Sequence, residues 1–528
     1  MGQGARVNRR QALLGAAALA AGCSEQHGRA APARWVDASQ DRGHRIRELG
    51  ALPAATRQRR TGVLIAGGGI AGLAAARALR RAGIEDFALL ELEDNAGGVS
   101  RGHTMGMQRC PLGAHYLPLP GPQAHEVSEF LHEAGLLRSE LGRSVADERH
   151  LCHSPQERLF IDGAWHEGLL PPTQAGSATL AQYRRFGALV DAAQRELGFA
   201  IPTHRAPWTP AHAALDAQTF AGWLIRQRLD DAKLSWYLDY ACRDDYGAGA
   251  NEVSAWAGLH YFASRHGFHV DEAGERDAVL TWPEGNAWLA ERLAAPLGER
   301  LQTSRTVLRL TVERHGVRAL AHDAASGAVE AWDAQALIVA LPLFIAARLV
   351  DPLPPALAEA AAGSAQAPWL VANLLLNRTM QDRGIGAPLS WDNVRYGGAS
   401  LGYVDASHQR LDPRPAPGVL TAYWALPRGE RGALLALGAD EWARRVVADL
   451  LPLHPDLPDK IARIDLKRHG HGMSIPLPGR RSSAALAALA SGFDRVQFAH
   501  ADLSAYSVFE EAFTHGDRAG RAVARRLR

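Results

Sequence analysis

The chain has 528 residues, of which 47% are hydrophobic and 22% are charged, so it is long enough for two domains with sizeable cores. A net charge of +2, with no basic run interleaved with aromatic residues, argues against a nucleic-acid partner. The four cysteines, Cys23, Cys110, Cys152 and Cys242, show neither a metal-ligand spacing nor a disulfide framework. We therefore expect a fold held by its core, without a metal ion.

The first 23 residues are similar to an export signal. Arg9 and Arg10 precede an apolar run, residues 12–22, that is too short to span a bilayer. Paired arginines before such a run resemble a bacterial twin-arginine signal, which implies the twin-arginine translocase as a partner and a periplasmic destination. The alternative is a chance pair before an Ala-rich helix. The run ends at Cys23 in a pattern that resembles a lipoprotein cleavage site, so we also consider membrane attachment through a lipidated Cys23.

Residues 24–60 are polar and rich in Arg and Ala, and they predict a linker. After them comes a turn typical of dinucleotide-binding proteins. An apolar run, residues 63–66, predicts a buried strand, and it leads through Gly67, Gly69 and Gly72 into a helix-forming segment. The first glycine permits the tight turn, the second lets the backbone approach a pyrophosphate, and the third lets the helix pack against the strand.

The start of the predicted helix and the next strand complete this site. Ile70 and Ala71 lie where the helix offers free N–H groups to phosphates. A second strand, residues 87–90, ends at Glu91, whose carboxylate can accept hydrogen bonds from both ribose hydroxyls. An acid at this position repels a 2′-phosphate, which argues against NADP. Strand, helix, second strand and acid together predict a dinucleotide site.

A second glycine pair and a later apolar segment extend the pattern. Gly97 and Gly98 precede Arg101, so backbone and a cation can approach the same pyrophosphate, although a plain surface turn is the alternative. With the glycine turn and Glu91, these residues resemble the FAD-binding amino terminus of the flavin amine oxidase superfamily. That group includes monoamine and polyamine oxidases, protoporphyrinogen oxidase and phytoene desaturases. The resemblance implies that residues 112–116 pass near the flavin ring, with contacts from Gly113, Ala114 and His115.

The middle of the chain alternates between two kinds of pattern. Residues 122–280 predict helices with long connections, over 124–137, 178–197 and 219–240. The polar run 242–247 is followed by Trp256 and His260 on a predicted helix. Together these residues either line a substrate cavity or form a buried network whose polar groups bond one another. Short strands then alternate with turns over 306–340. The resemblance implies that the backbone of Val307 contacts the adenine.

The carboxyl-terminal block is the second anchor of the resemblance. An apolar run ends at Asp502, and a final helix begins near residue 510. In the superfamily the acid hydrogen-bonds the ribityl chain, and the helix start, here near Ala512, points N–H groups at the flavin. His500 and Glu511 stand where glycine is common. A simple NAD dehydrogenase does not need this terminal strand, acid and helix. The glycine turn and this terminal unit together therefore favour FAD.

These patterns predict an α/β protein. A Rossmann-like FAD-binding domain of the glutathione-reductase and amine-oxidase type is assembled from residues 61–121, 281–345 and 467–528. A second, α+β substrate domain comprises residues 122–280 and 346–466.

Catalytic residues are less clearly marked. Many members of the superfamily place a lysine near the flavin on the strand that corresponds to residues 370–376; none stands there, and Asn373 is the nearest polar candidate. The aromatic residues that clamp amines are replaced near Gly472 and Val508. Alignment by the Pro-Gly at 478–479 places His471 where some members attach FAD. His471 is therefore expected to contact the flavin or to act as a base. The alternative is a histidine that only forms hydrogen bonds within a turn.

The sequence therefore predicts an exported FAD-dependent oxidoreductase. It would transfer a hydride from a small molecule, for example an amine or polyamine, to flavin N5, and pass the electrons to oxygen or another acceptor. The alternatives are an FAD-dependent desaturase or isomerase of an apolar substrate, and a non-catalytic flavin-binding partner protein.

Overall fold

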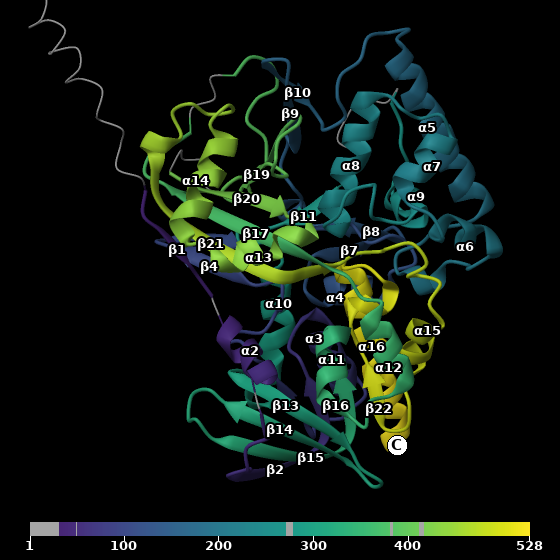
Figure 1. The fold of residues 1–528 in the computed structure, drawn as a ribbon, viewed down its shortest axis with the longest axis vertical. Coiled ribbons are helices and arrows are strands. Elements are labelled where there is room, and N and C mark those ends of the chain that lie inside the picture. The colour runs from purple at the N-terminus through teal and green to yellow at the C-terminus, as the bar shows by residue number, and fades with distance from the viewer. Residues whose placement is uncertain (1–30, 38, 49, 271–277, 381–383, 411–416) are drawn as a thin grey trace, which may run out of the picture.

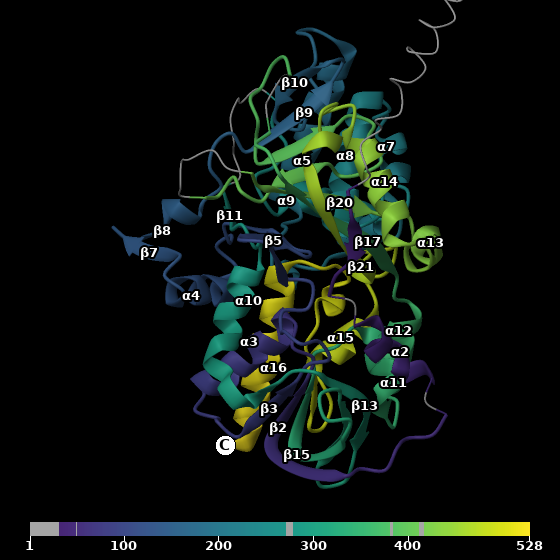
Figure 2. The ribbon, with the colours of Figure 1, turned by 90° about the vertical axis from the view of Figure 1, so that its left-hand side faces the viewer.

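A computed structural model describes residues 31–37, 39–48, 50–270, 278–380, 384–410 and 417–528. The chain forms two domains, each built around a large sheet, which lie one above the other in Figures 1 and 2. Among the described residues, no helix is both long and apolar enough to cross a membrane. The predicted export signal and Cys23 lie outside the described residues, so both remain predictions.

The lower domain in Figure 1 contains a mixed sheet with the order β12-β3-β2-β15-β14-β13-β16, and β22 pairs with β15. Strands β12, β3, β2, β15 and β22 run parallel, so their carboxyl ends meet at one edge, where such sheets bind ligands. The sheet confirms the α/β fold assembled from three separated segments. Its strands are β2 Arg57–Ala66, β3 Phe87–Leu90, β12 Leu301–Gln302, β13 Arg305–Val312, β14 Val317–Asp323, β15 Val329–Val339, β16 Val350–Asp351 and β22 Val496–Phe498.

Helices cover both faces of this sheet and bury its apolar side chains. One face packs against α3 (Ile70–Arg81), α4 (His125–Glu133), α10 (Ala287–Ala294) and α16 (Phe509–Leu527). The other face packs against α11 (Leu343–Leu349), α12 (Pro355–Ala362) and α15 (Ala484–Ser491). Two glycines let α16 approach α3 closely, because a Cβ at Gly516 would lie 2.1 Å from the Ala71 carbonyl oxygen and one at Gly520 2.6 Å from that of Ala75.

The upper domain contains a sheet with the order β1-β21-β17-β20-β19-β18-β9-β10. Helices α5 (Ala178–Glu196), α7 (Phe220–Arg226), α8 (Ala232–Tyr246) and α9 (Ala255–Ala263) form a core with one face, and α14 (Ala439–Leu450) packs near the other. The strands are β1 Ala33–Trp35, β9 Glu157–Ile161, β10 Ala164–Glu167, β17 Gln366–Leu376, β18 Asp392–Arg395, β19 Tyr403–Asp405, β20 Val419–Ala425 and β21 Ile461–Ser474.

Several expected boundaries need correction. The linker predicted over residues 24–60 is wrong for its described part, which contains β1, α2 (Gln40–Glu48) and the start of β2. Helix α4 belongs to the lower domain, because Phe130 stacks on Phe513 of α16. Strand β21 belongs to the upper sheet, so the last cofactor-domain segment begins after residue 474 rather than at 467. The helix predicted over 219–240 divides, because Asp231 caps a new helix, α8.

Candidate active site

The glycine turn lies at the carboxyl end of β2, as predicted. Gly67 has a φ of +104°, and a Cβ there would lie 2.3 Å from the Ala340 carbonyl oxygen. A Cβ at Gly72 would lie 1.9 Å from the Gly67 carbonyl oxygen, which explains why the helix can start so close to the strand. A Cβ at Gly69 would meet only the Gly98 Cα, at 3.9 Å. The protein therefore leaves space beside Gly69 that a ligand can approach.

No side chain caps the amino terminus of α3. Gly69 is the N-cap, and the first turn of the helix, including Ile70 and Ala71, contains no acid. Helix-start amides lack intrahelical partners, so these N–H groups suit a phosphate.

Glu91 lies beside this turn at the end of β3. Its Oε2 accepts from the Gly68 amide at 2.7 Å and its Oε1 from the Glu93 amide at 2.8 Å. The Arg305 amide donates to the Glu91 carbonyl oxygen, which brings the start of β13, and with it Val307, to the same corner. This corner fits a ribose and an adenine, and the open glycine turn fits the pyrophosphate between them and a flavin.

Gly97 and Gly98 face the first glycine turn. The Gly97 amide donates to the Gly68 carbonyl oxygen at 2.8 Å. Arg101 supports this second turn, because its Nε donates to the Gly98 carbonyl oxygen at 3.0 Å. Its Nη1 pairs with Asp37 and its Nη2 with Glu93. Each guanidinium nitrogen thus has a protein acceptor, and Arg101 holds the turn rather than offering a free fork to a phosphate.

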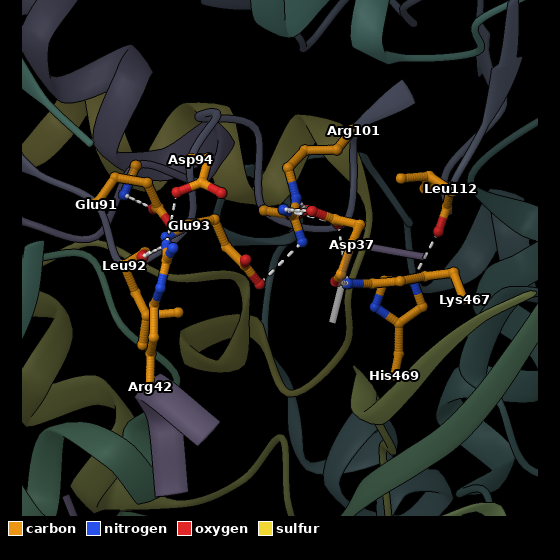
Figure 3. Close-up of polar contacts among 12 residues, drawn as sticks. Asp37, Arg42, Glu91, Leu92, Glu93, Asp94, Arg101, Leu112, Lys467 and His469 are labelled. Carbon is orange, nitrogen blue, oxygen red and sulfur yellow. Dashed lines mark hydrogen bonds and ion pairs between the residues drawn. The ribbon is translucent and has the colours of Figure 1, made fainter. Parts of the chain in front are cut away.

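The segment expected near the flavin is fixed by both domains. The Ala114 amide donates to the Val99 carbonyl oxygen, and a Cβ at Gly113 would lie 2.1 Å from that oxygen. The Tyr423 hydroxyl donates to the Gly113 carbonyl oxygen at 3.1 Å. His469 Nε2 donates to the Leu112 carbonyl oxygen at 2.6 Å (Figure 3). Backbone from the cofactor domain is therefore positioned by side chains of the upper sheet.

The carboxyl-terminal anchor is also assembled. Asp502 is fully buried, and it accepts from the Leu343 amide at 2.9 Å and from Gln366 Nε2 at 3.3 Å. Ala512 lies in the first turn of α16, but its own amide already donates to Val508. The amides that lack intrahelical partners are those of residues 509–511, which precede it.

Glu511, which stands where glycine is common, has a structural role. Its Oε1 accepts from the Thr203 amide at 2.6 Å and from the Tyr506 hydroxyl at 3.2 Å, and its Oε2 accepts from the Ser504 hydroxyl. These bonds connect the start of α16 to the loop at Thr203 in the upper domain.

The two predicted catalytic residues are not brought together. Asn373 is fully buried; its Nδ2 donates to the Pro111 carbonyl oxygen at 2.9 Å and its Oδ1 accepts from Thr421 at 2.7 Å. It has no surface for a substrate, so that expectation is corrected. His471 is exposed and packs against Phe344, with 4.6 Å between ring centroids. It lies six residues along β21 from Asp465, the pairing partner of Asn373, or about 20 Å.

A group of rings that sequence reasoning had not assembled lies next to Gly113 and Ala114. The His115 ring stacks on Tyr423, with 4.3 Å between centroids, and lies 5.5 Å from Trp391. Tyr116 meets Trp391 edge-on at 5.9 Å. Burial lowers the pKa of His115 to about 3, so the ring is neutral at pH 7. We call His115, Tyr116, Trp391 and Tyr423 the aromatic group.

Carboxylates adjoin the aromatic group. The Tyr116 hydroxyl lies 3.5 Å from Asp244 Oδ2. Burial and the charge of Asp245 raise the pKa of Asp244 to about 7. Burial, followed by the charges of Glu157 and Asp244, raises the pKa of Asp392.

The neighbouring cation is already paired, because Arg265 binds Asp245 at 3.1 Å. In the sequence, the polar run 242–247 was the signal for this region. Trp256 and His260 instead belong to a buried network, in which His260 donates to the Ala200 carbonyl oxygen at 3.2 Å.

Comparisons with known proteins identify the family of the chain. Residues 70–524 match the model of the flavin containing amine oxidoreductase family, and the chain belongs to that family. It is 33% identical over 197 residues to coproporphyrinogen III oxidase of Mycobacterium leprae (strain TN), a match that covers 36% of this chain and 40% of that protein. It is 26% identical over 268 residues to a flavin-containing amine oxidase of Oncorhynchus mykiss, covering 48% and 46%. The chain thus spans less than half the length of these curated relatives.

Solved structures show the same fold. A double mutant of putrescine oxidase matches with a TM-score of 0.68 at 19% identity, covering 88% of this chain and 99% of that one. Cyclohexylamine oxidase from Brevibacterium oxydans IH-35A matches with 0.66 at 18% identity, covering 88% and 99%. A fatty acid isomerase from P. acnes matches with 0.62 at 16% identity, covering 88% and 98%. These structures show the fold, and the family match implies FAD as the cofactor.

Proposed function

We propose that this oxidoreductase acts on an aliphatic amine that carries a second cationic group, such as a diamine or polyamine. The observation that carries the proposal is the contact of the aromatic group with Asp244 near the Leu112–His115 segment. Ring faces attract an alkylammonium ion, and an adjacent carboxylate binds its N–H groups. The putrescine and cyclohexylamine oxidases share only the fold, but amines are also the substrates that their names give.

The charges around this position favour a cation over an anion. Asp244 and Asp392 contribute carboxyl groups, and Arg265 is held by Asp245. The two histidines nearby are neutral at pH 7, because burial lowers the pKa of His115 and of His469 to about 3. A substrate ammonium therefore meets no histidine charge, whereas a substrate carboxylate would be repelled by Asp244 once it ionises.

The chain's own residues bind, orient and shield the substrate. FAD, when bound, supplies the hydride acceptor. Tyr423 joins the aromatic group to the Gly113 backbone, so a ligand held by the rings lies against the segment expected beside the flavin. The same rings exclude water from the reacting carbon, and Asp244 holds the distant ammonium group. These charges disfavour the alternative of an isomerase that acts on apolar acids.

The proposal is tested by anaerobic mixing of the purified holoenzyme with monoamines, diamines, polyamines and a fatty acid. We expect diamines or polyamines to bleach the flavin absorbance, and the fatty acid to leave it unchanged. In Asp244→Asn the KM for the best amine should rise about tenfold, with a smaller change in kcat.

Glu252→Gln is the matched control, because this acid of the same domain pairs with Arg428 at the surface, and its KM should equal that of the wild type. Flavin that dithionite reduces but no amine bleaches would contradict the proposal and favour a non-catalytic flavin protein.

A further inference from the structure

The segment that follows the predicted signal crosses from one domain to the other. In the upper domain, β1 pairs in parallel with β21, and Arg34 binds Asp465 through two bonds of 2.9 and 3.1 Å. In the lower domain, Arg42 of α2 donates to the Leu92 carbonyl oxygen at 3.0 Å and to Asp94 at 2.7 Å (Figure 3). We call residues 31–37 and 39–48 the clamp.

Asp37 stands at the crossing point of the clamp. Its φ of +52° is in the left-handed region, which aspartate and asparagine adopt more readily than most residues other than glycine. Its carboxylate binds Arg101 Nη1 at 2.7 Å and Lys467 Nζ at 2.9 Å, and its carbonyl oxygen also accepts from Lys467 (Figure 3). One acid thus joins the clamp, the cofactor domain and β21.

The two cations need this acid because both are nearly buried. The side chains of Arg101 and Lys467 are 8% and 7% exposed. Burial and the charge of Arg101 lower the pKa of Lys467, while Asp37 and Glu93 oppose that shift. Without the Asp37 carboxylate, Arg101 would keep its ion pair with Glu93 but Lys467 would lose its ion pair, and repulsion between the two buried cations would displace one of them.

Each cation leads to a different wall of the cofactor site. Arg101 supports the Gly97–Gly98 turn through the Gly98 carbonyl oxygen, and that turn faces the open side of Gly69. Lys467 is two residues from His469 on β21, and His469 holds the Leu112 carbonyl oxygen. Displacement of either cation would therefore move backbone that lines the cofactor.

We propose that Asp37 is a positioning residue of the FAD site: its negative charge keeps Arg101 and Lys467 in place, and with them the backbone of the pyrophosphate wall and of the flavin wall. The inference depends on the flavin site and not on the identity of the substrate. FAD binding can therefore fail independently of amine oxidation.

The test is the affinity of deflavinated protein for FAD, measured by quenching of flavin fluorescence. Asp37→Asn is the variant of choice, because asparagine tolerates the left-handed backbone and removes only the charge. We expect about tenfold weaker FAD binding. Asp94→Asn is the matched control: it breaks another ion pair of the clamp, at the surface, and should bind FAD as the wild type does.

A second variant separates charge compensation from simple loss of contacts. Asp37→Asn combined with Lys467→Met removes the acid together with one of its two cations. We expect the double variant to regain most of the FAD affinity, which a merely structural contact would not allow. The inference is overturned if Asp37→Asn binds FAD as tightly as the wild type, or if the double variant binds as weakly as the single one.

Discussion

At the scale of single residues, two glycines of one turn separate folding from cofactor binding. A Cβ at Gly72 would lie 1.9 Å from the Gly67 carbonyl oxygen, whereas one at Gly69 meets nothing closer than 3.9 Å. We expect Gly69→Val to fold but to purify colourless, because its side chain fills the space for the pyrophosphate. Gly72→Ala should lose about 3 kcal/mol or more of unfolding free energy.

Absorption spectra and urea unfolding of the two apoproteins check this pair. The assignment of the turn is wrong if Gly69→Val retains a full complement of flavin, or if it unfolds as easily as Gly72→Ala.

Asp244 predicts a pH dependence. Its pKa is raised to about 7 by burial and by Asp245, so the carboxyl ionises as the pH rises through neutrality. An ionised Asp244 attracts the substrate ammonium, and we expect kcat/KM for a diamine to rise about tenfold between pH 6 and 8, two values chosen about one unit either side of that pKa. The profile of Asp244→Asn should lack this rise, and an unchanged profile would contradict the role.

The same group affects stability with the opposite sign. Between its ordinary pKa of 3.8 and about 7, Asp244 binds more protons in the folded protein than in the unfolded chain. Its contribution to stability therefore falls as the pH rises through this window. Urea unfolding of the wild type and Asp244→Asn at pH 5 and 8, values inside and above the window, should show the variant gaining relative to the wild type at the higher pH. An equal difference at both values would contradict the shifted pKa.

Single residues also show where sequence reasoning stopped. Asp465, Lys467 and His469 alternate along β21 and share the face toward the cofactor domain, a period-two signal that was present in the sequence. His471 breaks the alternation, because Ala367 pairs with Met473 but Trp369 with His469. The resulting bulge opposite Pro368, which has no N–H to donate, leaves His471 exposed. Alignment by the later Pro-Gly could not reveal that shift.

At the scale of elements, the crossing of α3 and α16 joins the two ends of the chain. Gly516 lies against the Ala71 carbonyl oxygen, where a Cβ would be only 2.1 Å away. We expect Gly516→Ala to lower the unfolding free energy by about 3 kcal/mol and to weaken FAD binding, since the start of α3 must move. Gly432→Ala, in α13 (Arg431–Ala436) with no atom within 4 Å of the new Cβ, is the control.

Urea unfolding measures the unfolding free energy of both variants. That of Gly432→Ala should equal or slightly exceed the wild-type value, because alanine favours a helix. If Gly516→Ala had the same unfolding free energy as the wild type, α3 and α16 could move apart without loss of stability. The crossing could not be inferred beforehand, because which helices pack together depends on the order of strands in the sheet.

The clamp shows why short elements escape sequence analysis. Strand β1 has three residues, too few for a pattern of alternation, and α2 has no buried residue. Their composition is that of a linker. Their places are set by the edge of β21, by the acids at 37, 94 and 465, and by Trp35 and Ile46, which pack against the two cores. Long elements with clear signals, such as α5 over Ala178–Glu196, were predicted almost to the residue.

At the scale of the whole molecule, the order of assembly bears on the export that the first 23 residues predict. Strands β2, β15 and β22 are neighbours in one sheet, and α16 packs on α3. The FAD site is therefore complete only when residues beyond 512 have been made, and the cofactor must be bound by a full-length, folded chain. A route that threads an unfolded chain across the membrane would separate the protein from its cofactor supply. We propose that the pair Arg9 and Arg10 directs the loaded, folded protein to the twin-arginine translocase.

This proposal predicts the fate of Arg9→Lys combined with Arg10→Lys. Both substitutions keep the charge, so a merely electrostatic signal would still act, whereas a receptor that reads the arginine pair would not. We expect the double variant to accumulate in the cytoplasm with FAD bound, and the periplasmic fraction to lose most of its flavoprotein. A Gly69→Val protein that keeps the wild-type Arg9 and Arg10 supplies the second comparison. If FAD must be bound before export, this colourless protein should also stay in the cytoplasm. An unchanged periplasmic yield of the arginine variant would contradict the route, and efficient export of Gly69→Val would show that the translocase accepts the apoprotein.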